Sequence, residues 1–357
     1  MEDLLFRESI SVMDDEAKAF YRGKTVMVTG CGSIGGELCR QIAACSPRRL
    51  VMVDIYENNV YDLQQELLRV YGRELDLAVE IASVQDKVWM EAIFKTYRPD
   101  VVFHAAAHKH VPLMEHSIVS AVKNNVFGTY NVVELSERYG VKRFILISTD
   151  KAVNPTGVMG ATKRLCERIV QSRHDSATTF AAVRFGNVLG SCGSVIPLFR
   201  AQIEAGGPVT VTDKRMFRYL MTIPEAAQLV MQAGAMAQSG ELFVLDMGEP
   251  VKILDLAENL IRLLGYKPYE EIDIREIGLR PGEKLCEELL DTDGEAVKTA
   301  HDRIFIEKDE PVERSEIDEM LTLLSKALEQ ASESLDQTGV VEALHRAVPT
   351  FCKPEAK

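Results

Sequence analysis

Residues 28–38, VTGCGSIGGEL, determine how the first half of this chain is expected to fold. A β-branched run leads into the segment, a helical pattern leaves it, and the spaced glycines Gly30, Gly32 and Gly35 lie between the two. Such a loop turns tightly and lets the backbone approach a pyrophosphate, while the following helix N-terminus offers free N–H groups and a positive dipole end. We therefore predict that a dinucleotide binds at Gly30, Gly32, Ser33, Ile34 and Gly35.

A carboxylate stands where such a nucleotide would place its adenosine ribose. Asp54 ends the next predicted strand, 24 residues after Gly30. A carboxylate there can accept hydrogen bonds from the ribose hydroxyls, which favours NAD, with NADP as the alternative. In the alternative without a ligand, the glycines only make a tight turn and Asp54 caps a helix. The strand–loop–helix context and the position of Asp54 favour nucleotide binding.

Apolar runs alternate with helical patterns on both sides of the loop. Because the strands read as continuous apolar runs separated by helices, they predict an α/β fold with a doubly wound parallel sheet covered on both faces. Residues 121–140 are expected to form one long helix. The predicted strands are 25–30, 49–55, 77–83, 100–107, 143–149 and 180–188.

After residue 187 the alternation loosens, and Gly, Pro, Thr and polar residues become frequent. This change predicts a second, smaller lobe built from interleaved segments. We expect an N-terminal arm (1–21), a dinucleotide-binding domain (22–190, with a return at 222–247), a substrate-binding lobe (191–221 and 248–310) and a helical C-terminal segment (311–357).

Composition excludes several classes of protein. A net charge of −13 over 357 residues argues against a general nucleic-acid binder, which would normally show a basic surface. Seven cysteines without a C-x-x-C pair argue against a disulfide framework or a structural zinc site, so we expect a reducing cytoplasm. The acidic N-terminus does not read as a signal peptide, and no run of about 18 apolar residues predicts a membrane span.

The segment 148–163 contains the groups that point to chemistry. Nicotinamide enzymes of the short-chain dehydrogenase type usually carry Tyr-x-x-x-Lys here, whereas this chain has Met159 four residues before Lys163. It also has an acid and a base side by side, Asp150 and Lys151. A simple alcohol dehydrogenase needs no such pair, but an enzyme that oxidises, eliminates water and then reduces does. The alternative is a surface ion pair in a loop.

Residues 104–116, HAAAHKHVPLMEH, hold four of the seven histidines. A structural zinc site needs ligands that converge in a tetrahedron, usually with cysteines or paired spacing, and this stretch has neither. We therefore expect no metal. The three small residues that follow the strand are instead expected to let a flat cofactor pass closely; they are Ala105, Ala106 and Ala107.

Several motifs together resemble one family. They include STDKAVNPTGVMGATKR (148–164), VRFGNVLGSCGSVIPLF (183–199) and GLRPGEKLCEELL (278–290). The chain resembles, over residues 4–306, the CapD-like polysaccharide-biosynthesis branch of the extended short-chain dehydrogenase/reductases. The best-known members of this branch are UDP-N-acetylglucosamine 4,6-dehydratases. One departure from the family pattern is Gly157, where an asparagine is common.

The resemblance implies a reaction of three steps without net redox change. NAD takes a hydride from C4 of the sugar, water is eliminated across C5 and C6, and the hydride returns to C6. The resemblance also implies Asp150 as the acid to O6 and Lys151 as the base at C5. We expect burial and the nearby Lys163 to lower the pKa of Lys151. Thr149 is our candidate for assisting removal of the C4 hydroxyl proton, because Met159 cannot move a proton.

Further contacts are expected for both ligands. For the cofactor, Lys163 is assigned to the nicotinamide ribose. The remaining candidates are Asp86, Asn125 and Ser148 for the cofactor, and His108, Lys109, Asn187, Val195, Arg218, Arg280 and Glu283 for the substrate, with the arginines as diphosphate clamps because guanidinium pairs well with phosphate. The alternatives are that the arginines are solvated surface charges and that Asn125 holds the fourth-strand loop or the substrate.

Members of this branch with methionine in place of the catalytic tyrosine resemble the dehydratases that retain the C5 configuration, which are often membrane-anchored; this chain resembles their catalytic domain. Three alternatives stay open: an inverting dehydratase, a nucleotide-sugar 4-epimerase, and a noncatalytic cofactor-dependent sensor. The UDP-sugar identity rests on the resemblance alone. We also expect a homo-oligomer, whose dimer interface would use the helices predicted at 121–140 and 160–172.

Overall fold

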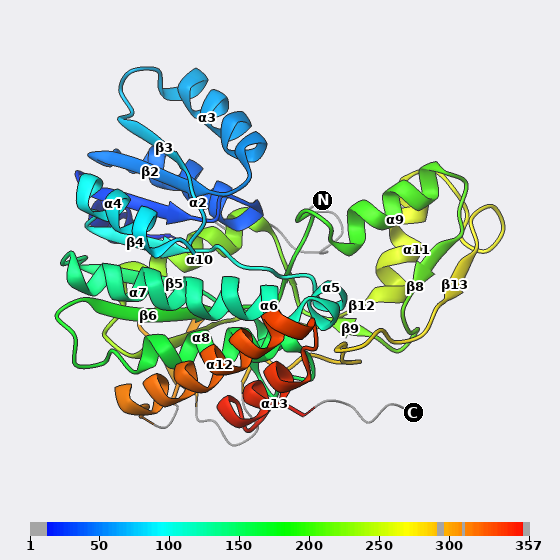
Figure 1. The fold of residues 1–357 in the computed structure, drawn as a ribbon. Coiled ribbons are helices and arrows are strands. Elements are labelled where there is room, and N and C mark those ends of the chain that lie inside the picture. The colour runs from blue at the N-terminus through cyan, green and yellow to red at the C-terminus, as the bar shows by residue number, and fades with distance from the viewer. Residues whose placement is uncertain (1–12, 291–295, 309–310, 353–357) are drawn as a thin grey trace.

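A nine-stranded sheet forms the centre of the computed structural model, which describes residues 13–290, 296–308 and 311–352 (Figure 1). Seven strands are parallel in the order β3-β2-β1-β4-β5-β6-β11, and β15 and β14 continue the sheet antiparallel. The predicted doubly wound α/β fold is therefore confirmed. The strands are β1 (Thr25–Thr29), β2 (Arg49–Asp54), β3 (Leu77–Ile81), β4 (Val101–His104), β5 (Arg143–Ile147), β6 (Thr179–Arg184), β11 (Glu241–Leu245), β14 (Ala296–Lys298) and β15 (Ile304–Glu307).

Helices cover both faces of the sheet because successive strand residues point to opposite sides. Met27 of β1 belongs to the apolar cluster under one helical layer, whereas Val26 and Val28 belong to the cluster under the other. The first layer contains α4 (Lys87–Tyr97), α5 (Val111–His116), α6 (Ile118–Ala121), α7 (Gly128–Arg138) and α8 (Val158–Gln171). The second contains α1 (Asp15–Tyr21), α2 (Ser33–Ala44), α3 (Glu57–Tyr71) and α10 (Ile223–Met236).

The helix expected over 121–140 differs in its first turns. A π-helical segment, η2 (Val122–Phe127), joins α6 to α7. Such segments inside helices are rare and often occur at functional sites. Here η2 contains Asn125, whose side chain is fully buried.

A smaller lobe projects from the sheet (Figure 1). It has an apolar cluster of its own, which includes Phe199, Val209, Leu256 and Ile274. Its elements are α9 (Val195–Glu204), α11 (Ile253–Leu263), the pair β8 (Val209–Val211) and β13 (Ile274–Glu276), and the pair β9 (Phe217–Arg218) and β12 (Val251–Lys252). A further pair, β7 (Asn187–Val188) and β10 (Leu220–Met221), connects the lobe to the main body.

The predicted lobe boundary needs one correction. Residues 248–310 were expected in the lobe, but β14 and β15 lie in the main sheet, where β15 pairs with β11. A buried ion pair accompanies this placement, because Arg184 of β6 contacts both Glu167 of α8, at 2.8 Å, and Glu307 of β15. Residues 1–12, most of the predicted arm, lie outside the described residues, as do residues 291–295, 309–310 and 353–357.

Two C-terminal helices, α12 (Arg314–Ser334) and α13 (Thr338–Ala347), pack against α8 on the outside of the first layer (Figure 1). Their apolar residues, such as Leu324 and Leu344, belong to the same cluster as Leu165 and Ile169 of α8. Every residue of α8 except Arg164 and Arg168 is buried within this single chain. The dimer interface expected on this helix is therefore covered by the chain's own C-terminal segment.

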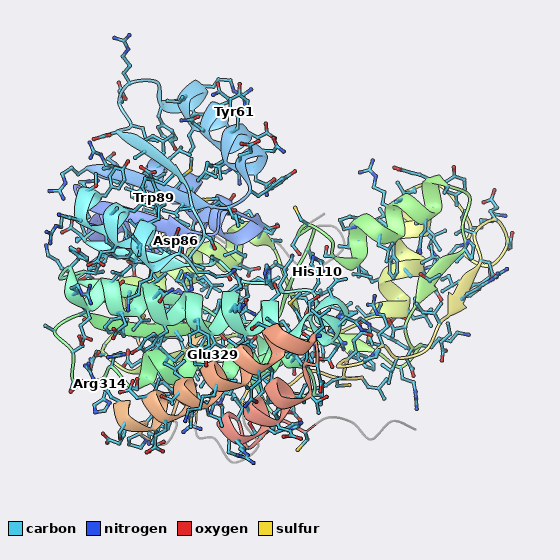
Figure 2. The ribbon with its side chains drawn as sticks, viewed as in Figure 1. Tyr61, Asp86, Trp89, His110, Arg314 and Glu329 are labelled. Atoms are coloured by element: carbon cyan, nitrogen blue, oxygen red, sulfur yellow. The ribbon has the colours of Figure 1, made fainter. Side chains whose placement is uncertain are left out.

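Arg314 anchors the start of this helical pair. Its guanidinium lies 2.9 Å from Oε1 of Glu137 on α7 and 2.7 Å from Oδ1 of Asp175 (Arg314 is labelled in Figure 2). These contacts bind α12 to the end of α7. In the described part of the chain, no helix is both long and apolar enough to cross a membrane.

Candidate active site

The predicted site residues meet at one edge of the sheet. The parallel strands β1, β2, β4 and β5 all end at the same edge, so the residues that follow them are brought together. Gly30 follows β1, Ala105 follows β4, and Ser148 follows β5. This is the edge at which ligands bind in open α/β sheets.

The glycine loop lies against the turn that follows β4. Gly30 has a φ of +83°, and a Cβ atom there would stand 2.3 Å from the backbone nitrogen of Ala106. A Cβ atom on Gly35 would stand 1.8 Å from the carbonyl oxygen of Gly30. Both positions therefore require glycine, for close approach of backbone to backbone. Gly32 precedes α2 without a side-chain cap, so the first N–H groups of that helix remain for a phosphate.

Asp54 holds the same loop. Its Oδ2 atom accepts a hydrogen bond from the backbone N–H of Cys31 at 2.5 Å, and Oδ1 accepts from Tyr56 at 2.8 Å. The side chain is partly exposed, so it can also meet a ribose. Ser33 and Ile34 form the first turn of α2, and the hydroxyl of Ser33 accepts a hydrogen bond from Cys192 N–H at 3.1 Å. The loop, the free helix N-terminus and this carboxylate fit a dinucleotide.

Hydrogen bonds from η2 hold the loop that contains the alanines after β4. Asn125 of η2 accepts a hydrogen bond from the N–H of His108 at 2.8 Å and donates to its carbonyl oxygen at 3.1 Å. Its amide also donates to Thr162 of α8 at 3.0 Å. Asn125 therefore fixes the loop that contains Ala105, Ala106 and Ala107, which agrees with one of the roles expected for it.

His104 is a core histidine. Its two ring nitrogens lie 2.6 Å from Oγ1 of Thr29 and 3.0 Å from Oγ1 of Thr129. Burial lowers the pKa of His104 to about 3, and the charge of Lys163 acts in the same direction. The ring is thus neutral and structural. Within the described ranges, no group of three or more histidine, cysteine or acidic side chains is arranged to hold a metal ion.

Asp86 has a structural partner as well. Its Oδ1 atom accepts the N–H of Trp89 at 3.0 Å and so caps α4; Figure 2 labels both residues. A contact between Asp86 and the cofactor remains a prediction that would use the other carboxylate oxygen.

Asp150 and Lys151 form a direct ion pair at the end of β5. Lys151 Nζ lies 2.8 Å from Asp150 Oδ1 and donates a hydrogen bond to Asn187 Oδ1 at 2.9 Å. Thr149 donates its hydroxyl to the same oxygen of Asp150 at 2.8 Å. Asp150 is fully buried, whereas the side chain of Lys151 is 22% exposed. The pair is therefore not a solvated surface ion pair, and Asn187 contacts Lys151.

Two predicted residues lie in the first turns of α8, the helix that packs against the turn containing this pair. Lys163 donates a hydrogen bond from Nζ to the carbonyl oxygen of Ile147 at 2.6 Å, and burial lowers its pKa. Met159 is buried in the apolar cluster. Ser148 instead donates its hydroxyl to Glu167 at 2.6 Å, deep in the core. A contact between Ser148 and the cofactor through that hydroxyl would compete with this bond.

The segment 280–288 returns from the lobe to the same place and brings an additional acid. Glu287 Oε1 lies 3.8 Å from Lys151 Nζ and 3.8 Å from the guanidinium of Arg218. Its other oxygen, Oε2, has no hydrogen-bond partner in the part of the chain that the structure describes. We did not predict Glu287, because only the tertiary fold brings residue 287 next to residue 151.

The pKa of Lys151 differs from the expectation. Burial acts to lower it, but the carboxylates of Asp150 and Glu287 outweigh burial, so the pKa of Lys151 is raised. The positive charge that acts on Lys151 is that of Arg218, not that of Lys163 as expected. For Glu287, burial dominates and raises the pKa despite the nearby cations.

The predicted substrate residues divide into two groups. Arg218 is buried and donates to the carbonyl oxygens of Lys284, at 2.8 Å, and Leu285, at 3.0 Å, so it holds the returning segment. Arg280 pairs with Glu283 at 2.6 Å. Because its side chain is half exposed, it is accessible to a diphosphate. His108 and Lys109 follow the alanine loop, and Val195 begins α9.

The start of the lobe lies close to the alanine loop. A Cβ atom on Gly193, which has a φ of +68°, would stand 2.5 Å from the ring of His110. Figure 2 shows His110 at the junction between the main body and the lobe. Together with the bond from Cys192 to Ser33, this contact places residues 192–193 over the edge of the sheet.

The doubly wound α/β fold is shared with solved structures of a dTDP-glucose 4,6-dehydratase and a UDP-glucose 4-epimerase. The family model described as "Polysaccharide biosynthesis protein" matches residues 26–309, and the chain belongs to this family.

Its curated relatives include enzymes of nucleotide-sugar chemistry. The chain is 50% identical over 321 residues to the capsular polysaccharide biosynthesis protein CapD of Staphylococcus aureus, covering 89% of this chain and 53% of that protein. It thus spans about half the length of that relative. It is 32% identical over 281 residues to a UDP-N-acetylglucosamine 4,6-dehydratase (inverting) of Campylobacter jejuni, covering 76% of this chain and 79% of that protein. A UDP-glucose 4-epimerase of Rickettsia canadensis is 34% identical over 278 residues, with coverages of 76% and 78%.

Among solved structures, Pen from Bacillus thuringiensis superposes with a TM-score of 0.75 at 35% sequence identity, covering 83% of this chain and 91% of that one.

Proposed function

We propose that this chain is a nucleotide-sugar 4,6-dehydratase, a lyase that converts UDP-N-acetylglucosamine to a UDP-2-acetamido-2,6-dideoxy-4-hexulose with retention at C5. Its place would be in cytoplasmic precursor synthesis for a surface polysaccharide or glycan. The observation that carries the proposal is the 2.8 Å contact between Asp150 and Lys151 at the ligand-binding edge of the sheet. A water elimination needs an acid and a base at the same place, and these two side chains supply both.

The chain's own residues suit a bound NAD. The glycine loop and the N-terminus of α2 would hold its pyrophosphate, Asp54 its adenosine ribose, and Lys163 its nicotinamide ribose. When bound, NAD would supply the hydride acceptor for C4 and the hydride donor for C6. Asp54 favours NAD over NADP because a 2′-phosphate would meet its negative charge.

The three polar groups beside the edge can account for every proton. The proton lost from the C4 hydroxyl passes through Thr149 to Asp150, along the 2.8 Å bond between them. Neutral Lys151 then takes the proton from C5, while Asp150 gives its proton to O6 and water leaves. Lys151 finally returns its proton to C5 as C6 is reduced. Both side chains end in the state in which they began, and the net change is loss of one water.

Lys151 must be neutral when it takes the proton from C5, yet its pKa is raised. The ion pair of the structure is thus a protonated form; the amine, which is 22% exposed, releases one proton to solvent before the elimination and regains it after turnover. Once Asp150 takes the proton from O4, one of the two carboxylates that stabilise the ammonium is neutralised. The first step therefore favours the free amine that the second step requires.

The test is to incubate the protein with UDP-N-acetylglucosamine in deuterated water and to follow the sugar by proton NMR. A 6-deoxy methyl signal together with a hydrated 4-ketone establishes the dehydratase. The ring couplings then distinguish retention from inversion at C5. An unchanged mass with a new C4 epimer would make the chain an epimerase, the activity named for the Rickettsia relative. Bound cofactor without turnover of this or other UDP-sugars would favour the sensor.

A further inference from the structure

Glu287 occupies an unusual position for a carboxylate. It is 7% exposed, lies 3.8 Å from both Lys151 and Arg218, and has one oxygen without a hydrogen-bond partner among the described residues. Burying a carboxylate is costly unless its charge is compensated. The two nearby cations compensate part of this cost, and one of them is the proposed base.

The segment that contains Glu287 is fixed from two sides. From the lobe, Arg218 donates to the carbonyl oxygens of Lys284 and Leu285. From the main body, the Thr156 hydroxyl donates to the carbonyl oxygen of Gly282 at 3.1 Å, and Lys284 donates to that of Val153 at 3.0 Å. The carboxylate is therefore held at its distance from Lys151 by the backbone around it.

Two glycines, Gly157 and Gly282, allow the segment that contains Glu287 to approach the start of α8 closely. A Cβ atom on Gly157 would stand 3.1 Å from the Cα atom of Gly282, and one on Gly282, where φ is +79°, would stand 2.9 Å from Val111. Gly157 is also the position at which this chain departs from the usual asparagine. A small cleft lined by these glycines, Lys151, Lys284 and Glu287 lies at the contact.

We propose that Glu287 is a positioning residue that holds the Lys151 amine at the sheet edge and controls how readily this amine gives up its proton. The effect of Glu287 on catalysis rests on the proposed function, whereas its effect on the protonation of Lys151 does not. The charged groups around the Lys151 amine are Asp150 on its own turn, Arg218 of β9, and Glu287, with Lys284 next to Glu287. A negative charge at 3.8 Å favours the ammonium, so removing that charge favours the free amine.

The experiment measures the titration of Lys151 directly, by the pH dependence of its acetylation in the intact protein, read by mass spectrometry of the peptide. In Glu287→Gln the midpoint should fall by about one to three pH units, from Coulomb's law at this distance. Glu287→Asp, which keeps the charge, should restore much of the shift. Glu288→Gln is the matched control, because Glu288 pairs with Lys284 and Asn154 on the outside of the segment.

An unchanged midpoint in Glu287→Gln would overturn the proposal, as would an equal shift in Glu288→Gln. This readout needs no turnover, so it stands even if the wild-type protein does not dehydrate UDP-N-acetylglucosamine. If the wild type does, the pH optimum of Glu287→Gln should move to lower pH. A loss of activity with the optimum and the midpoint both in place would show that Glu287 is only structural.

Discussion

Lys151 Nζ and Asp150 Oδ1 lie 2.8 Å apart, with the carboxylate fully buried and the amine at the rim of the site. Replacing either partner removes a proton carrier from the proposed elimination. We expect Lys151→Met and Asp150→Asn each to lower the rate of dehydration by about 10²–10⁴, the usual contribution of a positioned acid or base. The measurement is formation of the 4-keto-6-deoxy sugar by NMR.

An exposed lysine of α4 offers the control for that experiment: Lys95→Met should leave the rate unchanged. Wild-type rates in Lys151→Met would exclude this residue as the base.

The hydroxyl of Thr149 is the proposed first carrier of the O4 proton, because it donates to Asp150 at 2.8 Å. Thr149→Val keeps the shape and removes the hydroxyl, and we expect kcat to fall at least about ten-fold. Thr149→Ser, which keeps the hydroxyl, should retain most of the activity. The kinetic comparison is made at saturating substrate. Full activity of the valine variant would assign the O4 proton to another group.

The lowered pKa of His104 predicts how the free energy of unfolding depends on pH. Its folded-state pKa is about 3, below the ordinary value of 6.5, so the unfolded chain binds a proton more readily. The stabilisation that results from this difference in pKa is fully present above pH 6.5 and is lost as the pH falls toward 3. Between pH 7 and pH 4 we expect this residue alone to remove roughly 3 kcal/mol from the free energy of unfolding.

Denaturant unfolding of the wild type and of His104→Gln at both pH values tests this expectation. The glutamine side chain can hydrogen-bond to Thr29 and Thr129 but does not titrate, so the loss between the two pH values should be smaller in the variant. Equal losses would mean that His104 is protonated in the folded state.

The glycine loop separates positions that need glycine from one that has room for a side chain. In Gly30→Ala the new methyl group would stand 2.3 Å from the nitrogen of Ala106, with φ at +83°. We expect a loss of stability of several kcal/mol and no NAD binding, measured by thermal unfolding and by fluorescence titration with NADH. Among the described residues other than its two chain neighbours, no heavy atom lies within 4 Å of a Cβ atom built on Gly32, so Gly32→Ala should keep the fold. Equal melting temperatures would contradict the geometry.

The C-terminal helices belong to the core of the main body. Leu324 of α12 is fully buried in the cluster that includes α8, so Leu324→Ala should lower the free energy of unfolding by about 2–5 kcal/mol. Leu335, at the end of the same helix, is 90% exposed, and Leu335→Ala should change it by less than about 0.5 kcal/mol. Chemical denaturation compares the two. Similar effects would show that the helical pair does not contribute to this core.

Local sequence patterns were sufficient to predict the parallel strands of the sheet and many of the residues at its ligand-binding edge. The apolar runs identified every parallel strand from β1 to β6, because strands covered on both faces must be continuously apolar. They did not identify β14 and β15, which are short and join the sheet through partners far away in the chain. The π-helical segment at Asn125 was also unexpected, because it coincides with a tertiary contact to His108 that no periodicity records.

The sequence by itself determined the residue types at the edge of the sheet: glycines at 30 and 35, an acid at 54, and the acid–base pair 150–151. These follow from short-range spacing, since each lies at the end of a strand or in the first turn of the helix that follows it. Only the tertiary structure decided the environment of that pair. It placed Glu287 beside Lys151, where its charge adds to that of Asp150 and raises a pKa that we expected to be lowered, while Arg218 acts in the opposite direction. It also covered α8 with α12 and α13. Charge and burial at a point depend on segments that the chain brings together only when it folds, and no local pattern contains them.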